Sequence, residues 1–314
     1  LIPTDTTGRI HYSIGVRLMK YLVKENTITI DPERKYLKKT VDDFLNDYYQ
    51  SKKNKYLLLL NKQILLDGNT VKHGKEIIDH KTITITLPEE AVDWIPAETE
   101  CKVVYEDAFI YIVHKDAGMI IHGDPGDTTC LNAYAARYQI NHGIKQPVRP
   151  IHRLDKDTVG LVIYSKIPFF QPWFDAQLSS KRIHRHYLAI TNGNIDPSFR
   201  MTINKPLGRD RHNSGMYRVS STGVEAITYV EALGNYQSYS LLGCTLETGR
   251  THQIRVHLAS IDHPIVNDIL YGVKTKDFPA MGLWANWIEF KNPITNKKHK
   301  IFDQPNPMYE PFKK

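Results

Sequence analysis

The sequence has 314 residues, 41% of them hydrophobic, which is enough for one large or two ordinary domains, each with a buried core. No run of about 18 apolar residues could form a transmembrane helix, and the three cysteines are too scattered for a disulfide framework or a zinc site. The formal net charge of +7 fits a polyanionic partner. We therefore expect a cytoplasmic protein without a bound metal or membrane contact.

The N-terminal region is predicted to combine two short helices with strands. Apolar side chains recur at helical spacing from Val41 to Tyr48, and Leu57 to Leu60 form a second apolar face. Asp67-Gly68 is typical of a tight turn, and the alternating segment "KTITITL" that follows predicts a strand. We assign residues 1–88 to this region and residues 89–100, which are acidic and contain proline, to a linker.

The sequence after the linker is predicted to be rich in strands. A hairpin is expected in "KVVYEDAFIYIVHK", and a helix capped by Thr128 or Thr129 in "TTCLNAYAARYQI". Four apolar segments predict further strands: "GLVIYSK", "RIHRHYLAI", "VEAITYVEAL" and "YSLLGCTLETG". Because strands and helices do not alternate regularly, we predict an α+β fold with a mixed, largely antiparallel sheet and flanking helices.

The segment "HRLDKDTVG", residues 152–160, places a cluster of charges directly before an apolar strand. Such a cluster is usually a capped turn with solvated charges. Here the chain is entering a core, so we expect water to have restricted access to Asp155. A carboxylate in that position needs a cation beside it to stay charged.

Two arginines in "LETGRTHQIRVHLASIDHPIVNDILYG", residues 246–272, could supply this cation. Arg250 lies in a glycine-containing turn that opens a predicted helix. Arg255 follows five positions later, so the two side chains need not share a face. His252 and His257 are also five positions apart, which is not the spacing of two metal ligands on one helical face, and we expect structural histidines.

Several segments resemble, in order, the motifs of the RluA-type pseudouridine synthases. The match covers roughly residues 100–307. Its segments are "VVYEDAFIYIVHKDAGMIIHG", "HRLDKDTVGLVIYSK", "KRIHRHYLAITNG", "LETGRTHQIRVHLASIDHPIVNDILYG" and "WANWIEFKNPITNKKHKIFDQPNP". The resemblance implies a synthase catalytic domain at residues 101–314. Residues 39–88 resemble an alpha-L module, the RNA-binding module named for ribosomal protein S4.

The resemblance also implies an activity, the isomerisation of uridine in RNA without a cofactor. By motif position, Asp155 is the catalytic aspartate, Arg250 its partner and Tyr187 the aromatic residue that stacks on the uracil. Substrate contacts are expected from Arg153, which fills the space of the flipped base, and from His152, Thr158 and Arg255. We expect a monomer that acts on ribosomal RNA of the large subunit, or alternatively on transfer RNA.

Some positions depart from the family pattern. They are Val159 in place of serine, His114 and Asp116 in "HKDAG", Arg185 in place of lysine, and Asp262 and Asn267 in "DHPIVND". These changes leave open a non-catalytic RNA-binding protein on a synthase scaffold. A sugar-cleaving hydrolase that uses Asp155 with a second carboxylate is a weaker alternative, because no partner acid has a comparable context.

Overall fold

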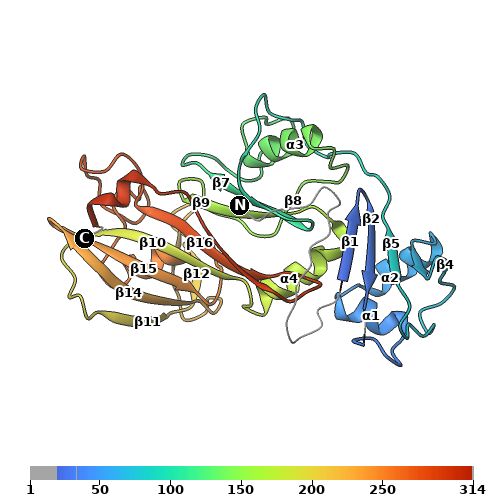
Figure 1. Cartoon of the computed structure of the whole chain (residues 1–314). Coiled ribbons are helices and arrows are strands. Elements are labelled where there is room, and N and C mark those ends of the chain that lie inside the picture. The colour runs from blue at the N-terminus through green and yellow to red at the C-terminus, as the bar shows by residue number, and fades with distance from the viewer. Residues whose placement is uncertain (1–19, 33, 313–314) are drawn as a thin grey trace.

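A ten-stranded sheet forms the C-terminal half of the chain in the computed structural model, which describes residues 20–32 and 34–312 (Figure 1). Eight strands follow in the order β11-β14-β15-β10-β16-β9-β7-β6, while β17 pairs with β16 and β8 with β9. Their bounds are β6 Lys102–Glu106, β7 Ile110–Lys115, β8 Arg149–Pro150, β9 Val159–Ser165, β10 His184–Asn192, β11 Arg200–Asn204, β14 Ile227–Tyr236, β15 Tyr239–Leu246, β16 Leu283–Lys291 and β17 Lys298–Phe302.

The sheet is mixed and largely antiparallel, as predicted. The pair β9–β16 is parallel, and the other pairs of this sheet are antiparallel. At the parallel pair Gly160 has a φ of +120°, and a Cβ built on it would lie 2.2 Å from the carbonyl oxygen of Ala285. A side chain at this position would therefore collide with the backbone of β16, which explains why the "TVG" segment ends in glycine.

The other elements of this half lie around the sheet. They are α3 Leu131–Asn141, the 3-10 helix η1 Pro168–Phe170, α4 Gln171–Ser179, the hairpin β12 Leu207–Arg209 with β13 Tyr217–Val219, α5 Gln253–Ala259 and the 3-10 helix η2 Pro307–Phe312. The predicted threonine cap of α3 is wrong, because the helix begins one residue later than expected and Cys130 is its N-cap. Thr129 instead donates its backbone amide to Asp127.

The N-terminal half contains the two short helices and the strands that we predicted. α1 Val41–Asp47 and α2 Lys52–Leu60 precede β3 Ile64–Leu66, β4 Asn69–Thr70 and β5 Ile83–Thr86. Asp67 and Gly68 both have positive φ and join β3 to β4, as the turn signal indicated. Ahead of these elements, β1 Lys20–Lys24 and β2 Thr27–Asp31 form a hairpin that adds to β5. Residues 1–38 resemble no part of the module, and of these residues 1–19 and 33 lie outside the described residues.

One hydrophobic cluster joins the two halves. Phe44 of α1 and Tyr48, the C-cap of this helix, pack against Phe169 and Phe170 of η1, and the ring centroids of Tyr48 and Phe170 lie 5.3 Å apart. Gln50 donates a hydrogen bond of 2.7 Å to the carbonyl of Phe169. Figure 1 shows the N-terminal half, in blue, at one end of the molecule beside α4.

The predicted linker has no helix or strand, and it packs along the C-terminal half. The amide of Ala97 donates to the carbonyl of Ala133, and Arg137 donates to the carbonyl of Ala97. Asp93 accepts from the amide of Val148 and pairs with Arg149. These contacts fix the path of the chain between its two halves.

Candidate active site

The site is a cleft beside β10 where the loop before β9 meets the N-terminal end of α5. Asp155 lies in this loop, and its side chain is 21% exposed. The residues lining the cleft are Arg153, Leu154, Asp155, Thr158, Arg185, Tyr187, Leu246, Gly249, Arg250, Thr251, His252, Gln253, Ile254, Arg255 and Leu283. Four segments that are far apart in the sequence thus converge on one aspartate.

Arg255 is the cation beside Asp155. Its Nη1 lies 3.3 Å from Oδ2 of Asp155, and its Nε and Nη2 donate hydrogen bonds of 2.7 and 2.8 Å to the two oxygens of Asp268. Burial alone would raise the pKa of Asp268, but the hydrogen bonds and charge of Arg255 lower it below the usual value. Asp268 therefore holds the guanidinium in the orientation that reaches Asp155.

The predicted ion pair between Asp155 and Arg250 is wrong. Arg250 is exposed at the cleft, and its Nε donates to the carbonyl of Glu225 at 3.0 Å. His252 adopts a left-handed backbone with φ of 56° and caps α5, so the helix starts at Gln253 and Arg250 lies in the turn before it. Arg255 falls on the buried face of the helix and takes the place that we had assigned to Arg250, rather than acting only as a substrate contact.

Three other predicted site residues lie along the cleft. Tyr187 on β10 is 4% exposed, and burial raises the pKa of its hydroxyl, as does the charge of Asp155, while Arg185 lowers it. Thr158 is buried, and its amide donates to the carbonyl of Asp155 at 3.2 Å. Arg153 is exposed at the rim. The cleft thus combines a carboxylate, a protonated phenol and four arginine side chains.

His152, which we predicted as a substrate contact, is buried outside the lining of the cleft. It is 8% exposed. Its Nε2 accepts a hydrogen bond of 3.4 Å from the amide of Ile163. Burial, together with the positive charge of Arg185, lowers its pKa to about 3, so the imidazole is neutral.

The two histidines of α5 have different surroundings. His257 is fully buried and satisfied by Thr228 and by the carbonyl of Lys205, both at 2.9 Å, as expected of a structural histidine. His252 lines the cleft with its Nε2 4.0 Å from Oδ2 of Asp155, and its Nδ1 lies 2.9 Å from the hydroxyl of Tyr271. The sequence reasoning missed Tyr271 and Asp268, although both stand in the quoted segment "NDILYG".

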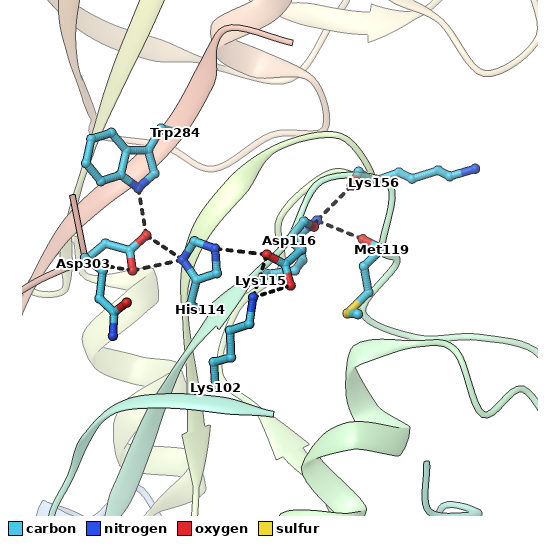
Figure 2. A network of polar contacts seen from close by, with 9 residues as sticks. Lys102, His114, Lys115, Asp116, Met119, Lys156, Trp284 and Asp303 are labelled. Carbon is cyan, nitrogen blue, oxygen red and sulfur yellow. Dashed lines mark hydrogen bonds and ion pairs between the residues drawn. The ribbon is translucent and has the colours of Figure 1, made fainter. Parts of the chain in front are cut away.

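A buried lysine supports the loop that carries Asp155. Lys115 at the end of β7 is fully buried, and Nζ donates to the carbonyls of Asp116, Met119 and Lys156 at 3.0, 2.8 and 2.8 Å (Figure 2). Burial lowers its pKa to about 8, although the charges of Asp157, Asp155 and Asp116 raise it. Because Lys156 follows Asp155, these three hydrogen bonds fix the loop that carries Asp155 to the sheet.

His114 and Asp116, the two residues of "HKDAG" that depart from the family pattern, contact each other. His114 lies 2.8 Å from the buried carboxylate of Asp303 and 3.4 Å from that of Asp116 (Figure 2). Asp303 also accepts from the indole of Trp284 at 2.7 Å, and Asp116 pairs with Lys102. These residues join β7 to the segment after β17, and none of them lines the cleft.

The presence of valine instead of serine at position 159 is explained by hydrophobic packing. Its side chain contacts a hydrophobic cluster that contains Trp284 and Leu188, and it does not line the cleft. The change from the family serine therefore removes a hydroxyl from the core side of the strand and leaves Asp155 untouched.

A basic hairpin borders the cleft. Arg209 and Arg218 of β12–β13 and Arg211 between them are exposed. Tyr217 anchors the hairpin, because its amide donates to the hydroxyl of Tyr271 at 2.7 Å and its ring lies 5.7 Å from that of His252.

Membrane-spanning helices and clusters of metal ligands are both absent from the part of the chain that the structure describes. No helix within residues 20–32 and 34–312 is long and apolar enough to cross a bilayer. In the same part of the chain, no group of three or more histidine, cysteine, aspartate or glutamate side chains is arranged to hold a metal ion.

Comparisons with known proteins identify the family to which this chain is similar. The profile of the family described as RNA pseudouridylate synthase matches residues 110–260. An uncharacterized RNA pseudouridine synthase of Bacillus subtilis, YlyB, is 33% identical over 292 residues, covering 90% of this chain and 95% of its own. The ribosomal large subunit pseudouridine synthase D of Xylella fastidiosa is 31% identical, over 74% of both chains. The structure of human RNA pseudouridylate synthase domain containing 1 shares the fold, with a TM-score of 0.54 and 24% identity over 66% of this chain and 84% of that one.

Proposed function

Because the chain belongs to the RluA-type family of RNA pseudouridine synthases, isomerases that act on RNA, we propose that it modifies uridines of large-subunit ribosomal RNA and that Asp155 is the reacting group. The observation that carries this proposal is the position of Asp155 in a cleft, beside Arg255 and close to Tyr187.

The arrangement suits chemistry at a sugar carbon. The bond between N1 of the uracil and C1′ of the ribose breaks, and the carboxylate of Asp155 attacks or stabilises C1′, as carboxylates do in sugar-cleaving enzymes. The uracil turns, C5 bonds to C1′, and the proton of C5 leaves while N1 gains one. Arg255, held by Asp268, balances the charge of Asp155 and fixes its position.

The remaining residues of the cleft have roles around the base. Tyr187 presents a buried ring and a protonated hydroxyl, which suits stacking on the uracil and relay of a proton. Arg153, exposed at the rim, fills the space that the flipped base leaves in its helix.

Binding of structured RNA involves two surfaces. The hairpin with Arg209, Arg211 and Arg218 supplies phosphate contacts next to the cleft. The second surface is the alpha-L-like module of residues 39–88, where Lys52 and Lys53 are exposed on α2. Several relatives named ribosomal large subunit pseudouridine synthase D support ribosomal RNA as the substrate, with transfer RNA as the alternative.

The test is to map pseudouridines in total RNA from cells with and without this protein. We expect at least one uridine of large-subunit ribosomal RNA to lose its modification, and a site lost only from transfer RNA would contradict the choice of RNA. Purified Asp155→Asn protein should restore none of it, while its circular dichroism and RNA affinity stay close to those of the wild type. Pseudouridine formed by this variant would refute the role of Asp155.

A further inference from the structure

Arg185 is a cation in the cleft without an anionic partner. Among residues 20–32 and 34–312, no carboxylate lies within 4.0 Å of its guanidinium, and its buried Nε has no hydrogen-bond partner. A buried guanidinium nitrogen left without an acceptor is unfavourable, and such groups persist at functional sites. The guanidinium of Arg185 is therefore available to a hydrogen-bond acceptor on a ligand, because the described part of the protein does not supply one.

The neighbouring residues hold Arg185 against the inner wall of the cleft. A Cβ built on Gly249 would lie 2.7 Å from Nη2 of Arg185, so the guanidinium lies directly on this glycine. Its charge also lowers the pKa values of His152 and Tyr187, so the guanidinium lies near both of these neutral side chains. Arg185 and Tyr187 are two positions apart on β10 and share one face of the strand.

The charges of the cleft favour a phosphate as the missing partner. Four arginines line the cleft, whereas Asp155 and its neighbour Asp268 provide two carboxylates, which leaves an excess of two positive charges. A nucleotide within an RNA strand carries one phosphate on each side, and each has one negative charge. A base stacked on Tyr187 brings one of these phosphates to the same face of β10 as Arg185.

We propose that Arg185 binds a backbone phosphate next to the target uridine and thereby positions the base against Tyr187. This inference rests on the proposed function and adds a binding residue to it. The usual lysine at this position would supply the same charge as a single point, whereas arginine can present two parallel donors to the phosphate oxygens.

The experiment combines an enzyme variant with a substrate variant. Synthetic RNA hairpins carry the mapped uridine with either its 5′ or its 3′ phosphate replaced by an uncharged methylphosphonate, as separated diastereomers. For one of the two positions, we expect the wild-type kcat/KM to fall about 10- to 100-fold, mainly through KM, as for loss of one charged hydrogen bond. On the unmodified hairpin, the kcat/KM of Arg185→Gln should fall by a similar factor. On the methylphosphonate hairpin, its kcat/KM should not fall any further.

Two variants separate charge from packing. Arg185→Lys keeps the charge and should retain part of the methylphosphonate effect. Arg182→Gln removes the same charge from an exposed position outside the cleft, and it should respond to the methylphosphonate as the wild type does. If Arg185→Gln does not fold, Arg185→Met takes its place.

If the loss of activity from Arg185→Gln and the loss from the methylphosphonate add to one another at both phosphate positions, the assignment of Arg185 to a phosphate is overturned. A contact between Arg185 and a uracil oxygen would then explain the effect of the variant. Failure of the wild-type enzyme to form pseudouridine in the unmodified hairpin would instead refute the proposed function, so the two failures are distinguishable.

Discussion

The cation beside Asp155 is Arg255, which lies within α5. This position explains why the sequence alone did not identify the correct arginine. Both Arg250 and Arg255 lie in the segment that resembles the family motif. The choice depends on where the helix begins, which is set by the left-handed conformation of His252. Histidine adopts that conformation only in a small minority of cases, so the sequence does not predict it here, and tertiary contacts offset its energetic cost.

The first prediction contrasts the two arginines. Arg255→Gln should lower kcat at least about 100-fold, because Asp155 loses the group that orients it and balances its charge. Arg250→Gln should mainly raise KM, because that side chain is exposed at the cleft. Single-turnover kinetics on the same RNA measures both effects. A larger fall of kcat in Arg250→Gln than in Arg255→Gln would restore the original pairing, provided that circular dichroism shows both variants folded.

The second prediction concerns His152. Its pKa is about 3 in the folded protein and about 6.5 in an unfolded chain, so the unfolded chain binds more protons between these values. The free energy of unfolding should therefore fall as the pH drops below about 6.5, by about 2 kcal/mol at pH 5.

Urea unfolding at pH 7 and pH 5 measures this contribution. His152→Gln keeps an acceptor for the amide of Ile163 and cannot titrate, so its stability should fall less between the two pH values. An identical fall in the variant and the wild type would show that His152 is not the group responsible.

At the scale of elements, apolar patterning predicted most of the fold. The strands β7, β9, β10, β14 and β15 coincide with the apolar segments because each is buried on at least one face. The network around Lys115 was not predicted. A lysine in sequence normally indicates an exposed charge, and its three carbonyl partners become neighbours only when the loops after β7 and before β9 meet.

The third prediction tests this network. Lys115→Met leaves three carbonyls without their donor, so we expect a loss of about 2 to 4 kcal/mol in stability and a lower kcat with little change in KM. Lys102→Met is the matched control, because Lys102 is exposed and its ion pair with Asp116 contributes about 1 kcal/mol or less. Thermal unfolding and steady-state kinetics of both variants check this. Equal behaviour of the two would show that the buried hydrogen bonds do not support the loop.

At the scale of the whole molecule, the two halves share a core although the sequence suggested a linker between them. The acidic segment with prolines predicts where regular structure stops, and residues 87–101 indeed contain no helix or strand. It does not predict that Phe44 and Tyr48 pack on Phe169 and Phe170, because such contacts depend on side chains more than a hundred residues apart.

The fourth prediction follows from this shared core. The protein should unfold in a single calorimetric transition, because neither half can lose its structure without exposing the aromatic residues of the other. Phe169→Ala should lower the stability by about 3 to 5 kcal/mol. Leu60→Ala, at a position that is 58% exposed, is the control and should have little effect. Two separate transitions in the wild-type protein would contradict this account.

The parallel pair β9–β16 has a consequence for how the enzyme matures during translation. Val159 and Gly160 leave the ribosome long before their partners Trp284 and Ala285 are synthesised. Until then β9 has no neighbour on that side, and β10 lacks one of the two strands that flank it. Leu283 of β16 lines the cleft, so the nascent chain cannot complete this cleft until β16 has emerged, and we expect a prematurely terminated product that lacks the strand to be inactive.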